Sequence, residues 1–565
     1  MTNSHALTIY KASAGSGKTF TLSVEYIKLL ILNPQSYRST LAVTFTNKAT
    51  EEMKLRILSQ LYGIWKLLPD SQGYIDKIKA DLDVSEGYMS ERAGIALHNI
   101  VHNSSYFRIE TIDSFFQSVL RNLARELDLT ANLRIELNDL QIERKAVDEL
   151  IDSLNENSEL LTWIMEYIRE NMDDDKNWNV ISQIKKFGQH IFREYYKTNS
   201  NILNERLLQE GFFKQYTSEL RQIRNEAEVE MQNEAAKFFD ILSQYNIEVD
   251  SLSYGKSGPA GYFIKMKNGI YDNTIVTKRV ENVLKNGGFA GWVKSDTPKK
   301  VKEMLSNVAS EMLSPLMAHA EKVRQEHWHD YGSAVLTLRH LNQLRLLNSI
   351  EKKVREMNVE QNLFLLSDTH TLLHSLIRDT DSPFIFEKIG NYLENIMIDE
   401  FQDTSTIQWQ NFKVLLEECM SHGEEQGNLI VGDVKQSIYR WRSGDWRMLN
   451  NIEREFPYMR SMLNVRSLDT NYRSSRRVIT FNNAFFERAA ELEYLEQKAE
   501  ASAECTANSP EQLKKAYADV AQQVPPFRKD QGFVSINLIP KDDYKQATLE
   551  KTAEAVSLLL DSGAA

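Results

Sequence analysis

One segment near the start of the chain restricts the fold more than any other, LTIYKASAGSGKTFTLSVEYIKLLIL. Its residues Leu7–Tyr10 predict a strand, and the apolar residues from Phe20 to Ile31 recur with the period of a helix. Between them lies a loop of small residues with two glycines and a lysine, the pattern of a phosphate-binding loop. A strand that leads through such a loop into a helix is the first unit of a parallel α/β sheet.

This loop contains the residue types that hold phosphate. Gly15 and Gly17 let the backbone fold tightly, so that its N–H groups converge on phosphate at the helix N-terminus. Lys18 supplies a cation for the β and γ phosphates, and the Thr19 hydroxyl can ligate Mg²⁺. The predicted nucleotide-binding residues are Ala12, Ser13, Ala14, Gly15, Ser16, Gly17, Lys18 and Thr19, with Ala12 in place of the first glycine of the strict pattern. The alternative is a chance glycine loop, which its position between a strand and a helix disfavours.

A second half of the site is predicted where an apolar run, Ile396–Ile398, ends in two acids. Ligand sites in parallel sheets lie outside the carboxyl ends of the strands. Neighbouring side chains of a strand point to opposite sides, so the two acids can differ in role. We expect Asp399 to be a partner of Mg²⁺, either directly or through one of the ion's ligands, and Glu400 to polarise the attacking water. The alternative is that both acids cap a helix that begins near Thr404.

Composition sets broader limits. A chain of 565 residues, 42% hydrophobic and 26% charged, predicts three or four globular domains. No apolar run approaches the roughly 18 residues of a membrane span, and the N-terminus lacks the pattern of a secretory signal, so we expect a cytoplasmic protein. Cys419 and Cys505 have no partners at metal-ligand spacing, which disfavours disulfides and zinc. The net charge of −12 argues weakly against nucleic-acid binding, although a groove needs only a local basic strip.

Five segments in this order, ASAGSGKT, LAVTFTNKATEEMKLRI, IMIDEFQDTS, IVGDVKQSIYRWRSGD and LDTNYRSS, resemble motifs I, Ia, II, III and IV of superfamily 1A DNA helicases, the UvrD/Rep group. The long stretch between Lys18 and Asp399 is similar to the enlarged insertion of the RecB/AddA branch of helicase–nuclease subunits. The resemblance implies an α/β fold: a RecA-like P-loop parallel sheet with a large, mostly helical insertion, plus the start of a second RecA-like domain. The expected domains are residues 1–130 and 356–470 for the first RecA-like domain, 131–355 for the insertion and 471–565 for the second domain.

The resemblance also implies roles near the nucleotide. Gln436 is expected to reach the γ-phosphate side of ATP, Tyr472 to pack on adenine and Arg473 to meet the γ-phosphate. With Lys18 and Glu400, Gln436 and Arg473 form the expected catalytic set, with ATP and Mg²⁺ as cofactors. No glutamine upstream of Ala12 corresponds to the adenine-reading motif of this group.

A DNA-binding surface is predicted from the segment VGDVKQSIYRWRSGD, which mixes aromatic residues with arginines. Tyr439 and Trp441 are expected to stack on bases, with Arg442 and Arg440 adding phosphate attraction. Because one loop would touch nucleotide at Gln436 and DNA a few residues later, we interpret it as a coupling element. The alternative is a partly buried aromatic loop at a domain boundary.

Two further segments are predicted to contact DNA. Phe45 can stack on a base while Thr46 and Asn47 bind phosphate, although Asn47 can instead be a helix cap. In FRIETIDSFFQSVL, Thr111 and Ser114 are the expected contacts, since Asp113 stands where many relatives have a histidine and would repel phosphate. His370 and His374 lie four residues apart on one predicted helix face, but no acid is evident to complete a metal site.

Within the insertion, residues 255–304 interleave lysines and glycines with Tyr262, Phe263, Phe289 and Trp292. One hypothesis is that this segment faces DNA. The alternative, at even odds, is a basic insert without a ligand.

The C-terminal part predicts a strand in GFVSINLIP and a helix that stops at Gly563. Motifs V and VI and a nuclease domain are not found in the chain, so we expect an incomplete motor that binds ATP and DNA weakly and unwinds little or nothing.

The expected function is ATP-dependent 3′-to-5′ DNA translocation and unwinding in repair and recombination. The expected partners are single-stranded DNA, duplex ends and a second helicase–nuclease subunit of the AddB/RecC type. One alternative is a non-motor DNA-binding subunit that uses ATP as a switch. Another is a small-molecule kinase, which the Tyr439–Arg442 segment disfavours.

Overall fold

The computed structural model describes residues 6–123, 134–136, 138–155, 160–162, 164–165, 168, 180–207, 209, 211–289, 291–294, 297–361, 363–379, 393–421, 427–500, 510–541 and 544–563. The chain forms two compact units. One, here called the P-loop unit, consists of residues 1–132 and 367–565. The other, the helical unit, consists of residues 133–366.

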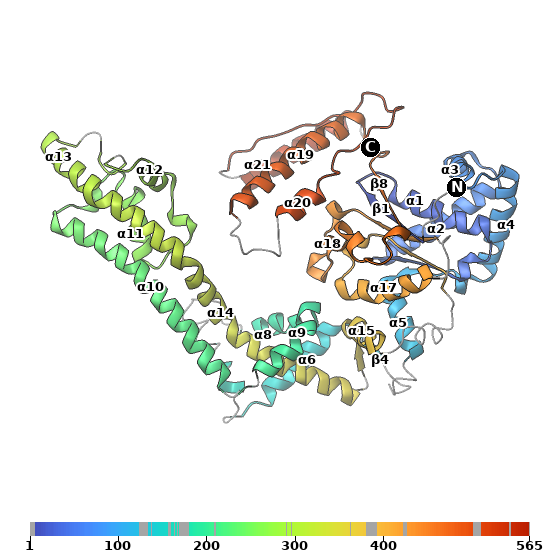
Figure 1. Cartoon of the computed structure of the whole chain (residues 1–565), viewed down its shortest axis with the longest axis horizontal. Helices are drawn as coiled ribbons and strands as arrows, with labels where there is room; N and C mark the ends of the chain where they lie inside the picture. The colour runs from blue at the N-terminus through green and yellow to red at the C-terminus, as the bar shows by residue number, and fades with distance from the viewer. Residues whose placement is uncertain are drawn as a thin grey trace. The chain divides into compact units, whose positions relative to one another are not determined.

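A six-stranded parallel sheet with the order β3-β2-β6-β7-β1-β8 forms the centre of the P-loop unit (Figure 1). Its strands are β1 (Leu7–Ala12), β2 (Thr40–Thr44), β3 (Ile109–Thr111), β6 (Asn395–Ile398), β7 (Asn428–Gly432) and β8 (Leu463–Leu468). In the register, Ile9 of β1 pairs with Ile430 and with Val465. Every residue of β2, β6 and β7 is buried, which explains why these strands are apolar on both faces.

Alternate strand residues face two separate hydrophobic cores. Val43 and Ile398 face a core built with α5, α15, α17 and α18, whereas Ala42 and Met397 face a core built with α1 to α4. The sheet is therefore the middle of three layers. The helices of this unit are α1 (Lys18–Leu32), α2 (Asn47–Trp65), α3 (Gln72–Leu82), α4 (Glu86–His102), α5 (Ile112–Leu123), α15 (Thr369–Asp379), α17 (Thr406–Ser421), α18 (Trp446–Asn450), α19 (Arg476–Glu500), α20 (Pro510–Ala516) and α21 (Tyr544–Asp561).

The helical unit is organised by two long helices, α10 (Phe212–Gln244) and α14 (Ser314–Gln361), which pack side by side (Figure 1). One end of α14 packs with α10 and α11 in a core around Phe238 and Trp292, and the other end packs with α6 and α8. The described residues of this unit also form α6 (Asp139–Asp152), α8 (Val180–Gly188), α9 (Glu194–Leu207), α11 (Ala260–Lys267), α12 (Lys278–Asn286), α13 (Lys299–Val308) and a short parallel pair, β4 (Arg134–Glu136) with β5 (Leu363–Leu365).

The predicted fold class is confirmed: a parallel P-loop sheet of the RecA-like kind with a mostly helical insertion. The insertion boundary expected at 355 falls inside α14, because that helix continues to Gln361 and the helical unit ends at Leu366. Residues 471–565 group with the P-loop unit, so a second domain that starts at 471 stays a prediction. None of the helices in the described part of the chain is long and apolar enough to cross a membrane.

The prediction of a strand in GFVSINLIP is wrong. Residues 532–540 have no regular secondary structure. Phe533 and Leu538 are 85% and 94% exposed, and no described strand pairs with the segment. An extended segment becomes a strand only when a neighbour supplies hydrogen bonds, which an alternating sequence cannot ensure. The helix before Gly563 is present as α21.

Candidate functional site

The phosphate loop, residues 12–19, connects β1 to the N-terminus of α1. Gly15 and Gly17 have φ angles of 72° and 85°, the left-handed region that glycine adopts without strain. The Ser16 amide donates to the Ser13 carbonyl at 3.2 Å, which closes the loop. Because α1 begins at Lys18, the free N–H groups of its first turn point to the loop interior and suit an anion.

Lys18 brings three distant segments together. Its Nζ donates to Glu400 Oε2 at 2.8 Å and to Gln436 Oε1 at 3.0 Å. The structure therefore joins the phosphate loop, the acidic pair after β6 and the loop after β7 at one edge of the sheet. A polyphosphate at this edge would replace both acceptors as the partner of the Lys18 ammonium group.

Asp399 and Glu400 follow β6 in different environments. Asp399 is buried, and its Oδ1 accepts a hydrogen bond from the Glu400 amide at 2.9 Å. Burial, together with the charge of Glu400, raises the pKa of Asp399 to about 6. Glu400 has φ 49° and ψ 42°, a conformation that is rare for a residue with a side chain and that turns its carboxylate towards Lys18.

Gln402 is a site residue that the sequence interpretation missed. It is 1% exposed, its Nε2 donates to Glu400 Oε2 at 2.7 Å, and its Oε1 accepts from the Asp433 amide at 2.9 Å. Gln402 thus fixes the Glu400 carboxylate and ties it to the end of β7. A glutamine inside IDEFQDTS was the available signal, because a buried amide two residues after a reactive acid needs polar partners.

The residues expected to bind metal fit a hard cation. Thr19 is the second residue of α1, and Asp399 offers a buried carboxylate whose ionised form is disfavoured without a nearby positive charge. The Oδ2 atom of Asp433 is also buried, with no hydrogen-bond partner in the described residues. Oxygen donors of this kind suit Mg²⁺ when phosphate and water complete its coordination. No group of three His, Cys, Asp or Glu side chains that would hold a metal ion unaided is present within those residues.

The loop after β8 approaches the phosphate loop. The Tyr472 amide donates to the Gly15 carbonyl at 3.0 Å, and a Cβ atom on Gly15 would lie 3.0 Å from Cβ of Arg473. Both predicted residues, Tyr472 and Arg473, are exposed at this edge. Asn471, which the sequence interpretation missed, is buried, and its Oδ1 accepts from the amides of Arg473 and Ser474 at 2.9 Å each.

The predicted DNA-contacting side chains after β2 and β7 lie together in what is here called the aromatic–arginine cluster, Phe45, Tyr439, Trp441 and Arg442. The ring centroids of Phe45 and Tyr439 are 4.4 Å apart, and those of Tyr439 and Trp441 are 6.0 Å apart. The Arg442 guanidinium lies 5.7 Å from the Phe45 ring and 5.4 Å from the Trp441 ring. Trp441 is 62% exposed, so its ring remains open to a base.

The residue that caps the N-terminus of α2 is not Asn47, which the sequence alone allowed in this role. The N-cap is Thr46, whose Oγ1 accepts from the Ala49 amide at 3.2 Å, and Asn47 is the first helical residue. The Asn47 side chain is therefore exposed and not used as a cap. The Thr46 hydroxyl thus satisfies one N–H group of the first turn of α2.

Thr111 and Ser114 cap α5 together, with their hydroxyl oxygens 2.8 Å apart and the Ser114 amide donating to Thr111 Oγ1 at 3.2 Å. Asp113 is paired inside the protein: its Oδ1 lies 2.9 Å from His370 Nε2 and 3.2 Å from Gln408 Nε2. Burial acts to raise the pKa of Asp113, but the interactions with His370, Arg442 and Gln408 together hold it below its usual value. The acid missing near His370 in the sequence is thus Asp113, in a hydrogen-bonded pair.

In the basic segment, residues 255–304, the aromatic residues and the lysines differ in exposure, although the DNA hypothesis grouped them together. Tyr262, Phe263 and Trp292 are at most 1% exposed and belong to the core of the helical unit, whereas Phe289 is 51% exposed. The aromatic residues are therefore mainly structural. Lys299 and Lys300 are exposed on α13, so only the charges keep the DNA hypothesis open.

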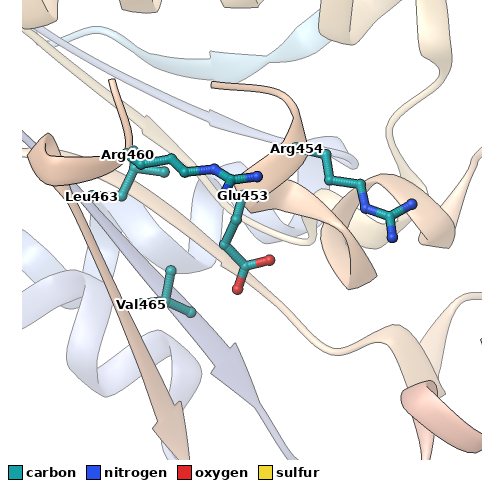
Figure 2. Close-up of a pocket in the computed structure, with 5 residues that line it drawn as sticks. All are labelled: Glu453, Arg454, Arg460, Leu463 and Val465. Atoms are coloured by element: carbon teal, nitrogen blue, oxygen red, sulfur yellow. The ribbon is translucent and has the colours of Figure 1, made fainter. Parts of the chain in front are cut away.

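A hollow of about 440 Å³ lies beside the edge strand β8 (Figure 2). It is lined by Glu453, Arg454, Arg460, Leu463 and Val465. None of these is a predicted site residue. Lys11 Nζ pairs with Glu453 at 3.4 Å, so the acid among these lining residues is already partnered.

The fold and the side chains around Lys18 define a P-loop nucleotide-binding protein with a parallel RecA-like sheet. The chain belongs to the family described as UvrD/REP helicase N-terminal domain, whose model matches residues 2–457. The family resemblance inferred from the motifs is thereby confirmed.

Curated relatives agree with this assignment. The chain is 24% identical over 535 residues to the A subunit of the ATP-dependent helicase/nuclease of Listeria monocytogenes serotype 4b (strain F2365), a match that covers 88% of this chain and 39% of the relative. It is 23% identical over 518 residues to the protein of that name from Clostridium botulinum (strain Alaska E43 / Type E3), with coverages of 86% and 39%. For the Thermoanaerobacter sp. (strain X514) protein of that name, the identity is 25% over 465 residues, with coverages of 77% and 34%. The chain thus spans less than half the length of these relatives.

Proposed function

We propose that this chain is the ATP-binding part of a DNA helicase, which hydrolyses ATP with Mg²⁺ and couples hydrolysis to 3′-to-5′ movement on single-stranded DNA. The direction follows from the family resemblance alone. The observation that carries the proposal is the double contact of Lys18 with Glu400 and Gln436, because it joins a phosphate site to the loop that holds Tyr439, Trp441 and Arg442.

In the proposed mechanism, the Lys18 ammonium group leaves the Glu400 carboxylate and pairs with the phosphates of ATP instead. Glu400, still held by Gln402, is then free to accept a proton from water at the γ-phosphate. Bound Mg²⁺ would be held by Thr19 and Asp399 and would neutralise phosphate charge. Arg473, at the edge of the phosphate loop, would stabilise the charge that develops on the transferred phosphoryl group.

Coupling to DNA would pass through two short anchors. The Ser437 hydroxyl donates to the Gln402 carbonyl at 3.3 Å, and the Ile438 amide donates to Asp403 Oδ1 at 3.2 Å. These bonds connect the neighbours of Glu400 to the loop between Gln436 and Tyr439. A change of partner at Gln436 on loss of the γ-phosphate would thus act on the aromatic–arginine cluster over a few residues.

The proposed partners are single-stranded DNA, duplex ends and a second subunit. The matched relatives are named as the A subunit of a helicase/nuclease, and such a name implies a companion, for which we propose the AddB/RecC type. A role in DNA repair and recombination and a cytoplasmic location are part of the same proposal.

The test is ATP hydrolysis with and without single-stranded DNA, for the wild-type chain and for Lys18→Ala. DNA-stimulated hydrolysis that Lys18→Ala abolishes supports the motor. Tight nucleotide-dependent DNA binding without turnover supports the alternative, a DNA-binding subunit that uses ATP as a switch. Nucleotide binding that is absent at saturating concentration contradicts both.

A further inference from the structure

A segment far from the helicase motifs crosses the nucleotide site. Residues 510–531, here called the strap, contain α20 and the irregular chain that follows it. At one end Lys515 Nζ donates to Asn451 Oδ1 at 2.9 Å. Further along, Asp519 accepts from Lys435 Nζ at 3.0 Å, and the same ammonium lies 3.3 Å from Asp433 Oδ1. The strap is therefore attached to the loop after β7.

Gln522 is the point at which the strap meets the phosphate loop. Its Nε2 donates to the Ala14 carbonyl at 2.6 Å, and its Oε1 accepts from Asn471 Nδ2 at 2.7 Å. The Gln522 backbone is held on both sides by Asn483 of α19, with N···O distances of 2.9 and 2.8 Å. The nitrogen and the oxygen of the Gln522 side-chain amide are thus both hydrogen-bonded, which fixes the orientation of the amide.

The hydrogen bond from Gln522 to the Ala14 carbonyl restricts the peptide unit between Ala14 and Gly15, whose N–H group can bind phosphate. In a trans peptide the carbonyl and the following N–H point in opposite directions, so fixing the Ala14 oxygen fixes the Gly15 N–H. Glycine at φ 72° permits rotation of that peptide at little cost, so the loop cannot set the N–H direction alone. A donor on the outside of the loop turns the N–H away from itself, towards the interior.

The hydrogen bond between Gln522 and Asn471 acts on the loop after β8. Asn471 Oδ1 accepts from the Arg473 amide, and a Cβ atom on Gly15 would lie only 2.6 Å from this oxygen. Gly15 therefore lies directly against the Asn471 side chain, with no room for a side chain of its own, and Gln522 hydrogen-bonds to both Ala14 and Asn471.

We propose that Gln522 is a positioning residue of the nucleotide site, which orients the Gly15 N–H towards phosphate and holds Arg473 at a set distance from the loop. This inference rests on the proposed function. Gln522 acts through Ala14 and Asn471 and does not itself contact the nucleotide.

Gln523 supplies a matched control. Its Nε2 donates to Asp469 Oδ2 at 2.7 Å, and its backbone amide donates to the Asp469 carbonyl at 2.8 Å. It is an adjacent glutamine on the same strap that anchors the chain without touching the phosphate loop. A variant at Gln523 therefore reports the effect of a loosened strap alone.

The experiment measures binding of a fluorescent ATPγS analogue and of the matching ADP analogue to the full 565-residue chain with Mg²⁺. We expect Gln522→Ala to weaken binding of both nucleotides by about tenfold, because it removes the hydrogen bonds to the Ala14 carbonyl and to Asn471. Gln523→Ala should change both affinities by less than about twofold. Gln522→Glu keeps an acceptor for Asn471 but cannot donate to the Ala14 carbonyl, so it should weaken binding at least as much. This isosteric variant decides the question if Gln522→Ala fails to fold, and thermal melting without nucleotide identifies that case.

The outcomes separate the inference from the proposed function. Wild-type affinity in the Gln522 variants, or an equal loss in Gln523→Ala, overturns the positioning role while the helicase proposal stands. A wild-type chain that binds neither nucleotide overturns both. A loss confined to ATPγS overturns the role at the Gly15 N–H, which should serve ADP as well, and supports the role at Arg473 alone.

Discussion

At the scale of single residues, the site depends on how a few charged groups are paired. Lys18 is occupied by Glu400 and Gln436, and Glu400 is held in turn by Gln402. Asp399 is buried beside them with a raised pKa. Because of these contacts, the proposed roles of the adjacent acids Asp399 and Glu400 differ. Glu400 is placed to accept a proton, and Asp399 is placed to bind a cation.

Glu400→Gln should lower ATP hydrolysis by about 10²- to 10⁴-fold while nucleotide binding is kept, because an amide of the same shape cannot accept a proton from water. The measurement is steady-state phosphate release together with equilibrium binding. Glu91→Gln, an exposed change on α4, is the control and should leave both unchanged. Wild-type turnover in Glu400→Gln would exclude Glu400 as the base.

Asp399→Asn should stabilise the nucleotide-free protein at pH 7.5. The folded-state pKa of about 6 lies above the usual 3.8, so folding opposes ionisation. The favourable contribution of the protonated carboxyl is present below the unfolded pKa and is lost as pH rises through 6. The expected gain is about 3 kcal/mol at pH 7.5, shrinking towards pH 4.

Denaturant unfolding at the two pH values measures this effect, without nucleotide or metal. Asp70→Asn, at an exposed position, should show no such pH-dependent gain. A stabilisation by Asp399→Asn that is the same at both pH values would show that packing, not ionisation, is responsible.

At the scale of elements, the ends of β1, β2, β6, β7 and β8 bring the site together. Each strand is followed at its carboxyl end by a loop with a different task. The loop after β7 spans two of these tasks, since Gln436 touches Lys18 and Tyr439 stacks near Phe45. Its bonds to Gln402 and Asp403 make it a short and well-anchored connection.

Trp441→Ala should weaken single-stranded DNA binding by about 1–3 kcal/mol through the loss of one stacking platform. Nucleotide affinity without DNA should not change, because Trp441 lies beyond the Gln436 contact. Fluorescence anisotropy with a labelled oligonucleotide measures the first quantity. Tyr458→Ala removes another aromatic ring, 98% exposed and outside the aromatic–arginine cluster, and an equal loss there would contradict a specific role for Trp441.

At the scale of the whole molecule, the two units have separate hydrophobic cores. Among the residues that the structure describes, the cores around the six-stranded sheet contain none from the helical unit, and the cores of the helical unit contain none from that sheet. A unit that buries its own core can fold alone.

Residues 133–366, expressed without the rest of the chain, should therefore give a helical circular dichroism spectrum and cooperative thermal unfolding. Phe238→Ala, in a fully buried position, should lower the unfolding free energy by about 3–5 kcal/mol. A non-cooperative melt of the wild-type unit would contradict an independent core.

The same isolated unit tests the basic segment. If residues 255–304 face DNA, the unit should bind duplex DNA weakly, and charge reversal at Lys299, Lys300 and Lys302 should reduce the slope of log affinity against log salt by about three. Lys352→Glu, an exposed change on α14, is the control. An unchanged slope in the triple variant would remove the DNA hypothesis for this segment.

Local patterns predicted the strand–loop–helix at Lys18, the acid pair after β6 and the aromatic–arginine loop, because glycine spacing and apolar runs act over a few residues. These local patterns were less reliable for residues whose contacts are far away in the sequence. Tyr262, Phe263 and Trp292 were grouped with the lysines by composition, although burial makes them core. The strand expected at residues 532–540 lacks a neighbour to pair with.

The amino-acid sequence by itself determined the kind of fold and the chemistry of its principal groups, since turn formation, helical period and motif order are local properties. Only the tertiary structure decided which groups meet: Gln402 with Glu400, Asp113 with His370, and Gln522 with the Ala14 carbonyl. The last two contacts join residues hundreds of positions apart, and hydrogen bonds depend on position to within a few tenths of an ångström. Such precision arises from the packing of strands and helices, and no short-range pattern contains it.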